Sequence, residues 1–130
     1  MARILIIDDD VTLLELIALV LLAAGHTVTT AADGEIAARL FRAAPFDLIL
    51  TDMIMPNGEG IETITTLRRE FPAIRIIAMS GGTRRSQNYL DMAARLGAHR
   101  TLSKPFAPDE LHAAIAATLA AEAMPPVQTE

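Results

Sequence analysis

The sequence contains no cysteine, and its basic residues are few. Without cysteine the chain can form no disulfide bond and has no thiol nucleophile, which excludes disulfide scaffolds and thiol-based catalysis. Eleven Lys and Arg residues stand against sixteen Asp and Glu residues, which leaves a net charge of -5. Because phosphate backbones are bound by clustered Lys and Arg, we expect no direct binding of nucleic acid.

A long apolar run and a secretory leader are also missing. The longest apolar stretch, 16–24, is far shorter than the ~20 residues needed to span a bilayer. The first three residues lead directly into a strand-like segment, without the charged, apolar and cleavage regions of a leader. We therefore expect a cytoplasmic protein without membrane insertion, with one domain at 1–123 and a flexible tail at 124–130.

Apolar segments of two kinds alternate along the chain. Runs without polar alternation predict strands buried on both faces, and apolar residues at every third or fourth position predict helices. The expected strands are 3–7, 46–52, 74–79 and a brief one at 100–103. A weaker, partly polar strand is expected at 26–31, nearer an edge of the sheet. The expected helices are 11–24, 34–44, 61–71, 85–96 and a last helix from 108 onward. This alternation predicts an α/β protein with a parallel sheet covered by helices on both faces.

The first helix has two apolar stripes. We expect one stripe to face the sheet, and it consists of Leu13, Leu16, Ile17, Val20 and Ala24. The other stripe, Leu14, Ala18 and Leu22, is predicted to face outward and to form part of a surface for docking a partner.

Polar residues follow four of the five predicted strands. They are Asp8 and Asp9 after the first strand, Asp52 at the end of the third, Ser80 after the fourth and Lys104 after the fifth. Because the carboxyl ends of parallel strands share one edge of the sheet, these side chains should converge. Three adjacent carboxylates repel one another, so we expect compensation by Lys104 and by Mg²⁺. The Ser80 hydroxyl and the Lys104 ammonium could then hold a phosphoryl group on Asp52.

Two other readings use the same residues. The segment Asp8–Thr12 has the pattern D-x-D-x-T of phosphatases of the haloacid-dehalogenase type. That class needs a further acidic pair on the fourth strand and usually an inserted cap, and 79–82 offers no acid. A flavodoxin-like FMN carrier would need a first loop rich in hydroxyls and glycine, whereas three aspartates would repel a phosphate.

Taken together, the motifs resemble the receiver domain of two-component response regulators. They are Asp8-Asp9, Asp52 followed by 53–60, Ser80, and Lys104-Pro105-Phe106, and the resemblance covers about 3–121. It implies a doubly wound, flavodoxin-like sheet with strand order 2-1-3-4-5. It also implies that a sensor histidine kinase or a histidine phosphotransfer protein supplies a phosphoryl group to Asp52. The domain would catalyse its own phosphorylation and dephosphorylation and signal to a downstream protein.

The resemblance assigns a role to each matching residue. The implied Mg²⁺ ligands are Asp9, Asp52 and the Ile54 carbonyl, with Asp8 acting through water. Ser80 corresponds to the switch hydroxyl and Lys104 to the lysine that binds the phosphoryl oxygens. The Lys104-Pro105 peptide bond is expected to be cis. A stand-alone receiver is expected from a chain that begins at Met1.

Thr101 departs from the family pattern, which usually has Tyr or Phe at this position. We therefore predict that the output is carried by the loop after Ser80 and by the helix 85–96, which includes Tyr89. The three histidines, His26, His99 and His112, are expected to be surface or loop residues. The two basic doublets, Arg68-Arg69 and Arg84-Arg85, are expected to be solvated helix ends or loops.

Overall fold

The computed structural model describes residues 2–53, 59–81 and 84–120. Strands and helices alternate throughout this part of the chain. The strands are β1 (Arg3–Ile7), β2 (Thr27–Ala31), β3 (Leu48–Asp52), β4 (Ile76–Gly81) and β5 (Arg100–Lys104). The helices are α1 (Val11–Ala23), α2 (Gly34–Ala43), α3 (Glu59–Glu70), α4 (Arg84–Leu96) and α5 (Pro108–Ala120).

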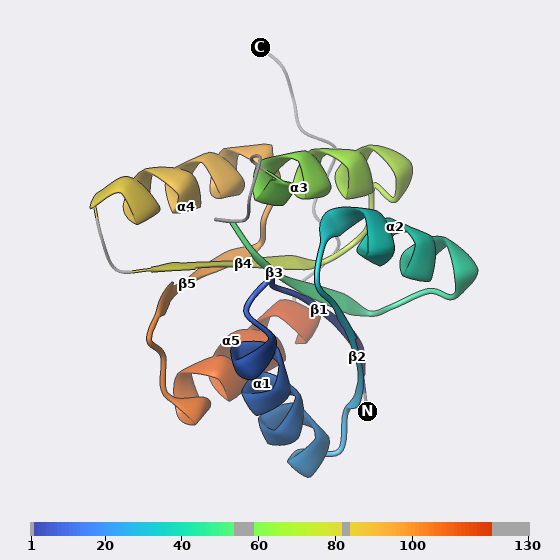
Figure 1. Cartoon of the computed structure of the whole chain (residues 1–130), viewed down its shortest axis with the longest axis vertical. Coiled ribbons are helices and arrows are strands. Elements are labelled where there is room, and N and C mark those ends of the chain that lie inside the picture. Colours follow the sequence, from blue (N-terminus) through green and yellow to red (C-terminus); the bar gives the residue numbers. More distant parts are fainter. Residues whose placement is uncertain (1, 54–58, 82–83, 121–130) are drawn as a thin grey trace.

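The five strands form one parallel sheet in the order β2-β1-β3-β4-β5, as the resemblance implied. Helices α1 and α5 cover one face of the sheet, and α2, α3 and α4 cover the other (Figure 1). The doubly wound α/β prediction is therefore confirmed. The order places β3 at the centre, with β2 and β5 at the two edges.

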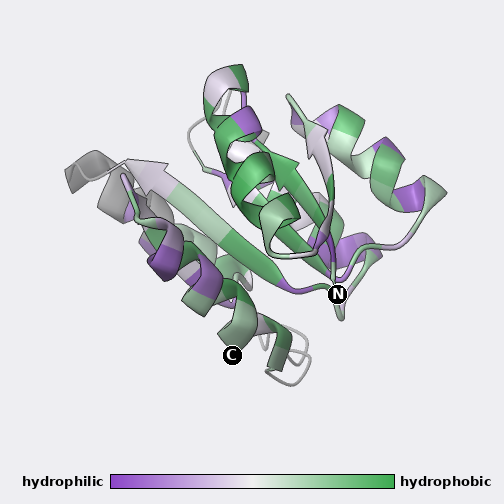
Figure 2. Ribbon diagram, turned by 90° about the horizontal axis from the view of Figure 1, so that it is seen from below, coloured by the Kyte–Doolittle hydropathy of each residue, from purple (hydrophilic) through white to green (hydrophobic). Residues whose placement is uncertain are grey.

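Each face of the sheet has its own hydrophobic core. One core joins Leu5 and Ile49 to the helices α2, α3 and α4, and the other joins Ile4 and Leu50 to α1 and α5. The inner strands carry hydrophobic residues along their length (Figure 2). Because both faces are covered, β3 is buried at all five positions, which explains its lack of polar alternation.

Local signals set the helix ends. Asp10 caps α1 by accepting a hydrogen bond from the Leu13 backbone N–H at 3.2 Å, and Asp33 caps α2 through the Ile36 N–H at 2.8 Å. After α1, Gly25 adopts a φ of 93°, a conformation that favours glycine and ends the helix. The two N-caps fix where α1 and α2 begin, and Gly25 fixes where α1 ends.

The predicted orientation of α1 is wrong for Leu14 and Leu16, whereas the inward position of Ile17 and the outward position of Leu22 are as predicted. The buried residues of α1 are Leu14, Ile17 and Leu21, whereas Leu16 is 56% exposed and Leu19 is 64% exposed. The helix is apolar on all sides, since Thr12 and Glu15 are its only polar residues. With two nearly equivalent stripes, periodicity does not decide which one faces the sheet. The inward stripe is Leu14, Ile17 and Leu21, and the outward apolar face is Val11, Leu16, Leu19 and Leu22.

Two smaller predictions also differ from the structure. Strand β4 begins at Ile76 rather than at residue 74, because Ile74 belongs to a turn in which its N–H donates to Phe71 O at 3.0 Å. In α2, helical spacing predicts one apolar face made of Ile36, Ala37, Leu40 and Phe41. Ala37 and Phe41 are buried and Leu40 packs against the core, but Ile36 is exposed. The predicted tail, 124–130, lies outside the described residues.

No helix among the described residues is long and apolar enough to cross a membrane.

Candidate functional site at the carboxyl edge of the sheet

Four parallel strands deliver polar residues to the same edge of the sheet. Asp8 and Asp9 follow β1, Asp52 ends β3, Ser80 lies near the end of β4, and Lys104 ends β5. In the sheet register Asp52 pairs with Met79, so Ser80 lies one residue beyond the partner of Asp52. The predicted convergence of these strand ends is confirmed.

Three carboxylates come together at this edge. Asp8, Asp9 and Asp52 each offer one oxygen, and these oxygens lie within 4.8 Å of one another. Asp8 and Asp52 are buried, while Asp9 is exposed. Like charges at such a separation repel by about 4 kcal/mol per pair at an effective dielectric constant of about 20. No packing requirement explains this arrangement, which needs positive charge nearby.

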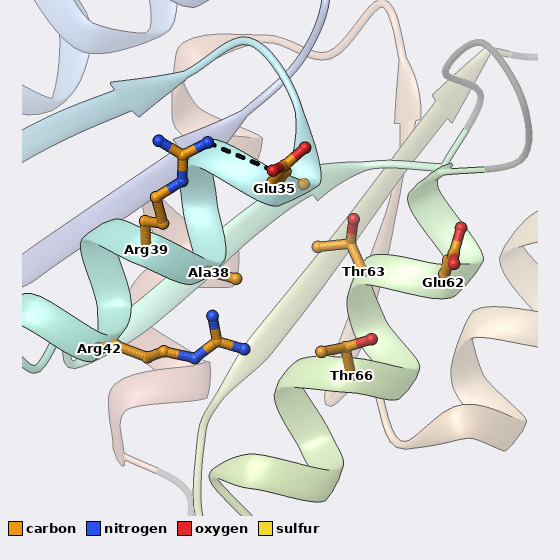
Figure 3. Close-up of a pocket in the computed structure, with 8 residues that line it drawn as sticks. Glu35, Ala38, Arg39, Arg42, Glu62, Thr63 and Thr66 are labelled. Atoms are coloured by element: carbon orange, nitrogen blue, oxygen red, sulfur yellow. Dashed lines mark hydrogen bonds and ion pairs between the residues drawn. The ribbon is translucent and has the colours of Figure 1, made fainter.

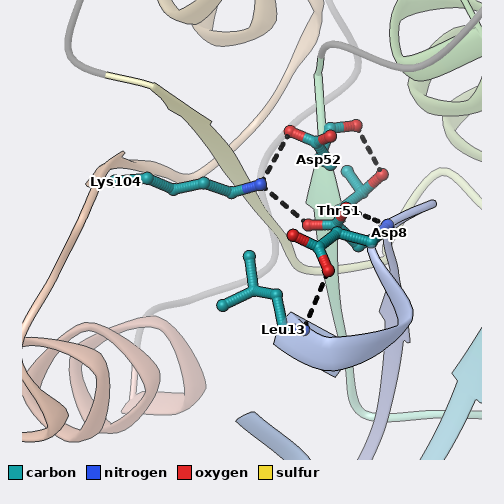
Figure 4. Close-up of polar contacts among 6 residues, drawn as sticks. Asp8, Leu13, Thr51, Asp52 and Lys104 are labelled. Carbon is teal, nitrogen blue, oxygen red and sulfur yellow. Dashed lines mark hydrogen bonds and ion pairs between the residues drawn. The ribbon is translucent and has the colours of Figure 1, made fainter. Parts of the chain in front are cut away.

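Lys104 supplies one positive charge. Its Nζ atom lies 2.8 Å from Asp8 Oδ2 and 3.3 Å from Asp52 Oδ1 (Figure 4). Burial by itself lowers the pKa of Lys104, but the hydrogen bond to Asp8 and the charges of Asp52 and Asp8 outweigh it and raise the pKa above its ordinary value. The ammonium is therefore charged at neutral pH. The peptide bond from Lys104 to Pro105 is cis, as predicted.

Backbone and hydroxyl groups orient the acids. The Asp10 N–H donates to Asp8 Oδ1 at 3.0 Å, so both oxygens of Asp8 accept hydrogen bonds. The Thr51 hydroxyl donates to the Asp52 carbonyl at 3.1 Å (Figure 4). Asp10 itself turns away to cap α1, which removes it from the carboxylate cluster.

Ser80 has a buried hydroxyl with no hydrogen-bond partner among the described residues. Buried polar atoms are nearly always satisfied, so an unsatisfied one at a strand end needs an explanation. A ligand oxygen arriving at the edge would provide the missing partner.

The donor set fits a hard divalent cation. Three carboxylate oxygens within one coordination sphere suit Mg²⁺, which prefers oxygen ligands and keeps several waters. The Ile54 carbonyl, implied as a further ligand, lies outside the described residues. After Asp52, Gly60 packs closely on the chain, since a Cβ there would lie 2.6 Å from the carbonyl carbon of Met53.

Thr101 is exposed, with no bulky ring at this position of β5. Residues 82–83 and the side chain of Tyr89 lie outside the described residues, so the expected output route through them stays a prediction.

A groove between two helices shares no lining residue with the carboxylate cluster. This groove of about 390 Å³ lies between α2 and α3, with Arg39 and Arg42 on one side and Thr63 and Thr66 on the other (Figure 3). Its arginines already form ion pairs, Arg39 with Glu35 at 3.3 Å and Arg42 with Glu70 at 2.7 Å. The groove therefore offers little charge to an incoming ligand.

Sequence reasoning missed the contacts of two basic groups at the opposite edge of the sheet, the buried Arg68 and the half-buried His99. Arg68 is 8% exposed and donates hydrogen bonds to Pro72 O and Gly97 O, so it is not a solvated helix end. His99 accepts from the Ile76 N–H at 3.3 Å through Nδ1, and its Nε2 atom is buried. A signal for Arg68 was present, because it lies four residues after the buried Ile64 and so on the inward face of α3.

The profile of the response regulator receiver domain family matches residues 4–116. The chain is 32% identical over 117 residues to the alkaline phosphatase synthesis transcriptional regulatory protein PhoP of Bacillus subtilis, covering 90% of this chain and 48% of that protein. The chain thus spans about half the length of the curated relatives it matches.

Solved structures show the same fold. A putative response regulator from Chloroflexus aurantiacus superimposes with a TM-score of 0.85 at 29% identity, covering 92% of this chain and 98% of that one. The chemotaxis protein CheY4 of Vibrio cholerae superimposes with a TM-score of 0.82 at 29% identity, covering 91% and 98%. These matches support neither of the two alternative functions, a phosphatase of the haloacid-dehalogenase type or a flavodoxin-like FMN carrier. The chain belongs to the family of response regulator receiver domains.

Proposed function

We propose that this domain accepts a phosphoryl group on Asp52 from a phosphohistidine donor. The observation that carries the proposal is the convergence of Asp52 with Asp8, Asp9 and Lys104 at the end of the central strand. In the transfer an Asp52 carboxylate oxygen forms the new O–P bond, the P–N bond of the donor breaks, and the imidazole leaves with the bonding electron pair.

Each residue at the edge then has a task. Lys104 lies within reach of an Asp52 oxygen and would hold the phosphoryl oxygens by charge-assisted hydrogen bonds. The unsatisfied hydroxyl of Ser80 would donate to one of those oxygens. Asp8, Asp9 and Asp52 would hold Mg²⁺, which when bound neutralises negative charge on the phosphoryl group. Hydrolysis by water at the same site would return Asp52 to its carboxylate form.

Labelling by a small phosphodonor tests the assignment of Asp52. Acetyl phosphate with Mg²⁺ should add one phosphoryl group to the wild-type chain, as measured by intact mass. Asp52→Asn should remove the labelling, because its amide is a poor nucleophile. Asp109→Asn is a matched control, since Asp109 is exposed in the first turn of α5. Equal labelling of Asp52→Asn and wild type would place the phosphoryl group elsewhere.

We propose further that the outward apolar face of α1 docks the helices of the kinase or phosphotransfer protein. Val11, Leu16, Leu19 and Leu22 are each more than half exposed, and α1 begins directly after the acidic residues of the site. An exposed apolar face on a surface helix is typical of a binding surface. This face replaces the stripe expected from the sequence, in which Leu14 is buried.

A charge placed on this face separates docking from chemistry. Leu16→Arg should slow phosphotransfer from a cognate histidine donor by at least about tenfold, which corresponds to ~1.4 kcal/mol. Labelling by acetyl phosphate should stay unchanged, since the substitution lies outside the carboxylate cluster. Ile36→Arg, on an exposed position of α2, should affect neither reaction. Equal loss with both donors would indicate a damaged fold.

A further inference from the structure

Lys104 is the single lysine of the sequence. Its Nζ atom bridges Asp8 and Asp52, two of the three carboxylates that form the cluster. The lysine side chain is only 22% exposed and the Asp8 side chain 1%, so solvent screens their pairing weakly. The positive charge nearest to the cluster is therefore a fixed part of the protein.

Both carboxylate oxygens of Asp8 already accept hydrogen bonds within the protein. Its Oδ1 atom accepts from the Asp10 N–H at 3.0 Å, and its Oδ2 atom accepts from Lys104 at 2.8 Å. Asp52 shares one oxygen with the same ammonium at 3.3 Å. A metal ion held by these carboxylates would lie a few Å from Nζ, and the two positive charges would repel each other.

We infer that Lys104 competes with Mg²⁺ for Asp8 and Asp52 and so keeps the metal affinity of the site low. The inference rests on the proposed function, because it concerns the same carboxylates. Lys104 neutralises part of the cluster before any ion binds, which reduces the repulsion that a metal would otherwise relieve. Metal binding then requires the ammonium to move away from at least one of its two partners.

A Mg²⁺ titration followed by amide chemical shifts tests this without any phosphodonor. Lys104→Met should bind Mg²⁺ about tenfold more tightly than wild type, which corresponds to ~1.4 kcal/mol. Lys104→Arg keeps the positive charge and should stay closer to the wild-type affinity than Lys104→Met does. An equal affinity in wild type and Lys104→Met would overturn the inference.

The single lysine also allows a measurement on the unaltered protein. Lysine labelled with carbon-13 at Cε gives one side-chain signal, which reports on Lys104 alone. This signal should shift during the titration with the same midpoint as the amide signals. A lysine signal that stays in place while the site fills would overturn the inference, even if Lys104→Met did not fold.

The outcomes also separate this inference from the proposed function. Absence of any Mg²⁺ binding, together with absence of labelling by acetyl phosphate, would contradict both. Normal Mg²⁺-dependent labelling, with equal affinity in Lys104→Met and wild type, would contradict only the competition.

Discussion

The two edges of the sheet bury charge in opposite ways. The carboxyl edge gathers Asp8, Asp9 and Asp52 around one ammonium, and a buried Ser80 hydroxyl there has no partner among the described residues. At the amino edge, near the starts of β4 and β5, the guanidinium of Arg68 donates to two backbone carbonyls.

The difference shows how a functional site can be told from a structural one. Arg68 is stabilised by carbonyl groups that need donors, since they lie at the ends of α3 and α4. The carboxylates of the other edge repel one another, which costs stability that the fold has to supply elsewhere. Both edges contain a buried polar atom without a partner among the described residues, Ser80 Oγ at one and His99 Nε2 at the other, so the repulsion among the clustered carboxylates is what marks the carboxyl edge as a ligand site.

Replacement of Arg68 should have the largest effect on stability. Arg68→Met removes the donor of the buried Gly97 O and that of Pro72 O, which belongs to an exposed residue. An unsatisfied buried group costs about 1–3 kcal/mol, so we expect a loss of about 2 kcal/mol. Its neighbour Arg69 is exposed, and Arg69→Met should change stability by less than about 0.5 kcal/mol. Urea denaturation of the two variants measures the difference. A similar small change in both would show that Arg68 is no structural link between α3 and the loop before β5.

Much of the carboxyl edge could be predicted from the sequence. Parallel strands all end at the same edge of the sheet. Asp52 at the end of β3 and the polar residues at the ends of β1, β4 and β5 therefore had to share that edge. The alternation of strands and helices likewise fixed the layers of the fold. These inferences depend only on local pattern and on the rules of parallel sheets.

The rest depended on contacts that local pattern does not encode. Helix α1 is apolar on all sides, so Glu15 and Thr12 were the only residues in it that indicated which side faces solvent. His99 was expected to be a surface or loop residue and lies in the loop before β5, but its hydrogen bond with the Ile76 backbone N–H on the neighbouring strand was not predicted. That contact exists only once β4 and β5 are paired. The strand order itself came from the resemblance to receiver domains and not from periodicity.

Removal of one acid from the carboxyl edge should stabilise the fold. Asp9 is the exposed member of the cluster, so Asp9→Asn relieves repulsion with Asp8 and Asp52 without leaving a buried charge unpaired. Because solvent screens the charge of the exposed Asp9, we expect a gain of only about 0.5–1 kcal/mol in the free energy of unfolding, measured without Mg²⁺. Asp33→Asn is the control, because asparagine caps a helix about as well as aspartate and should change little. A loss of stability in Asp9→Asn would mean that its charge is compensated within the protein.

The smallest expected effect is a difference in how the two edges respond to pH. Burial, together with the charges of Arg68 and Arg75, lowers the pKa of His99 below its ordinary value of 6.5. A lowered folded-state pKa means that the unfolded chain binds the proton more readily, so stability is full above pH 6.5 and falls as the pH drops below it. The pKa of Lys104 is raised above its ordinary value of 10.5, so its contribution is full below pH 10.5 and is lost as the pH rises through the folded-state value. Acid should therefore weaken the amino edge and alkali the carboxyl edge.

Denaturation between pH 5 and 8 tests the effect of acid. In a plot of stability against pH, His99→Gln, whose side chain can still accept from Ile76 N–H, should flatten the acid limb, whereas His112→Gln should leave it unchanged. Lys104→Arg, which keeps its charge at high pH, should flatten the alkaline limb. If the acid limb kept its slope in His99→Gln, the loss would come from other groups and His99 would not be the group that weakens the amino edge in acid.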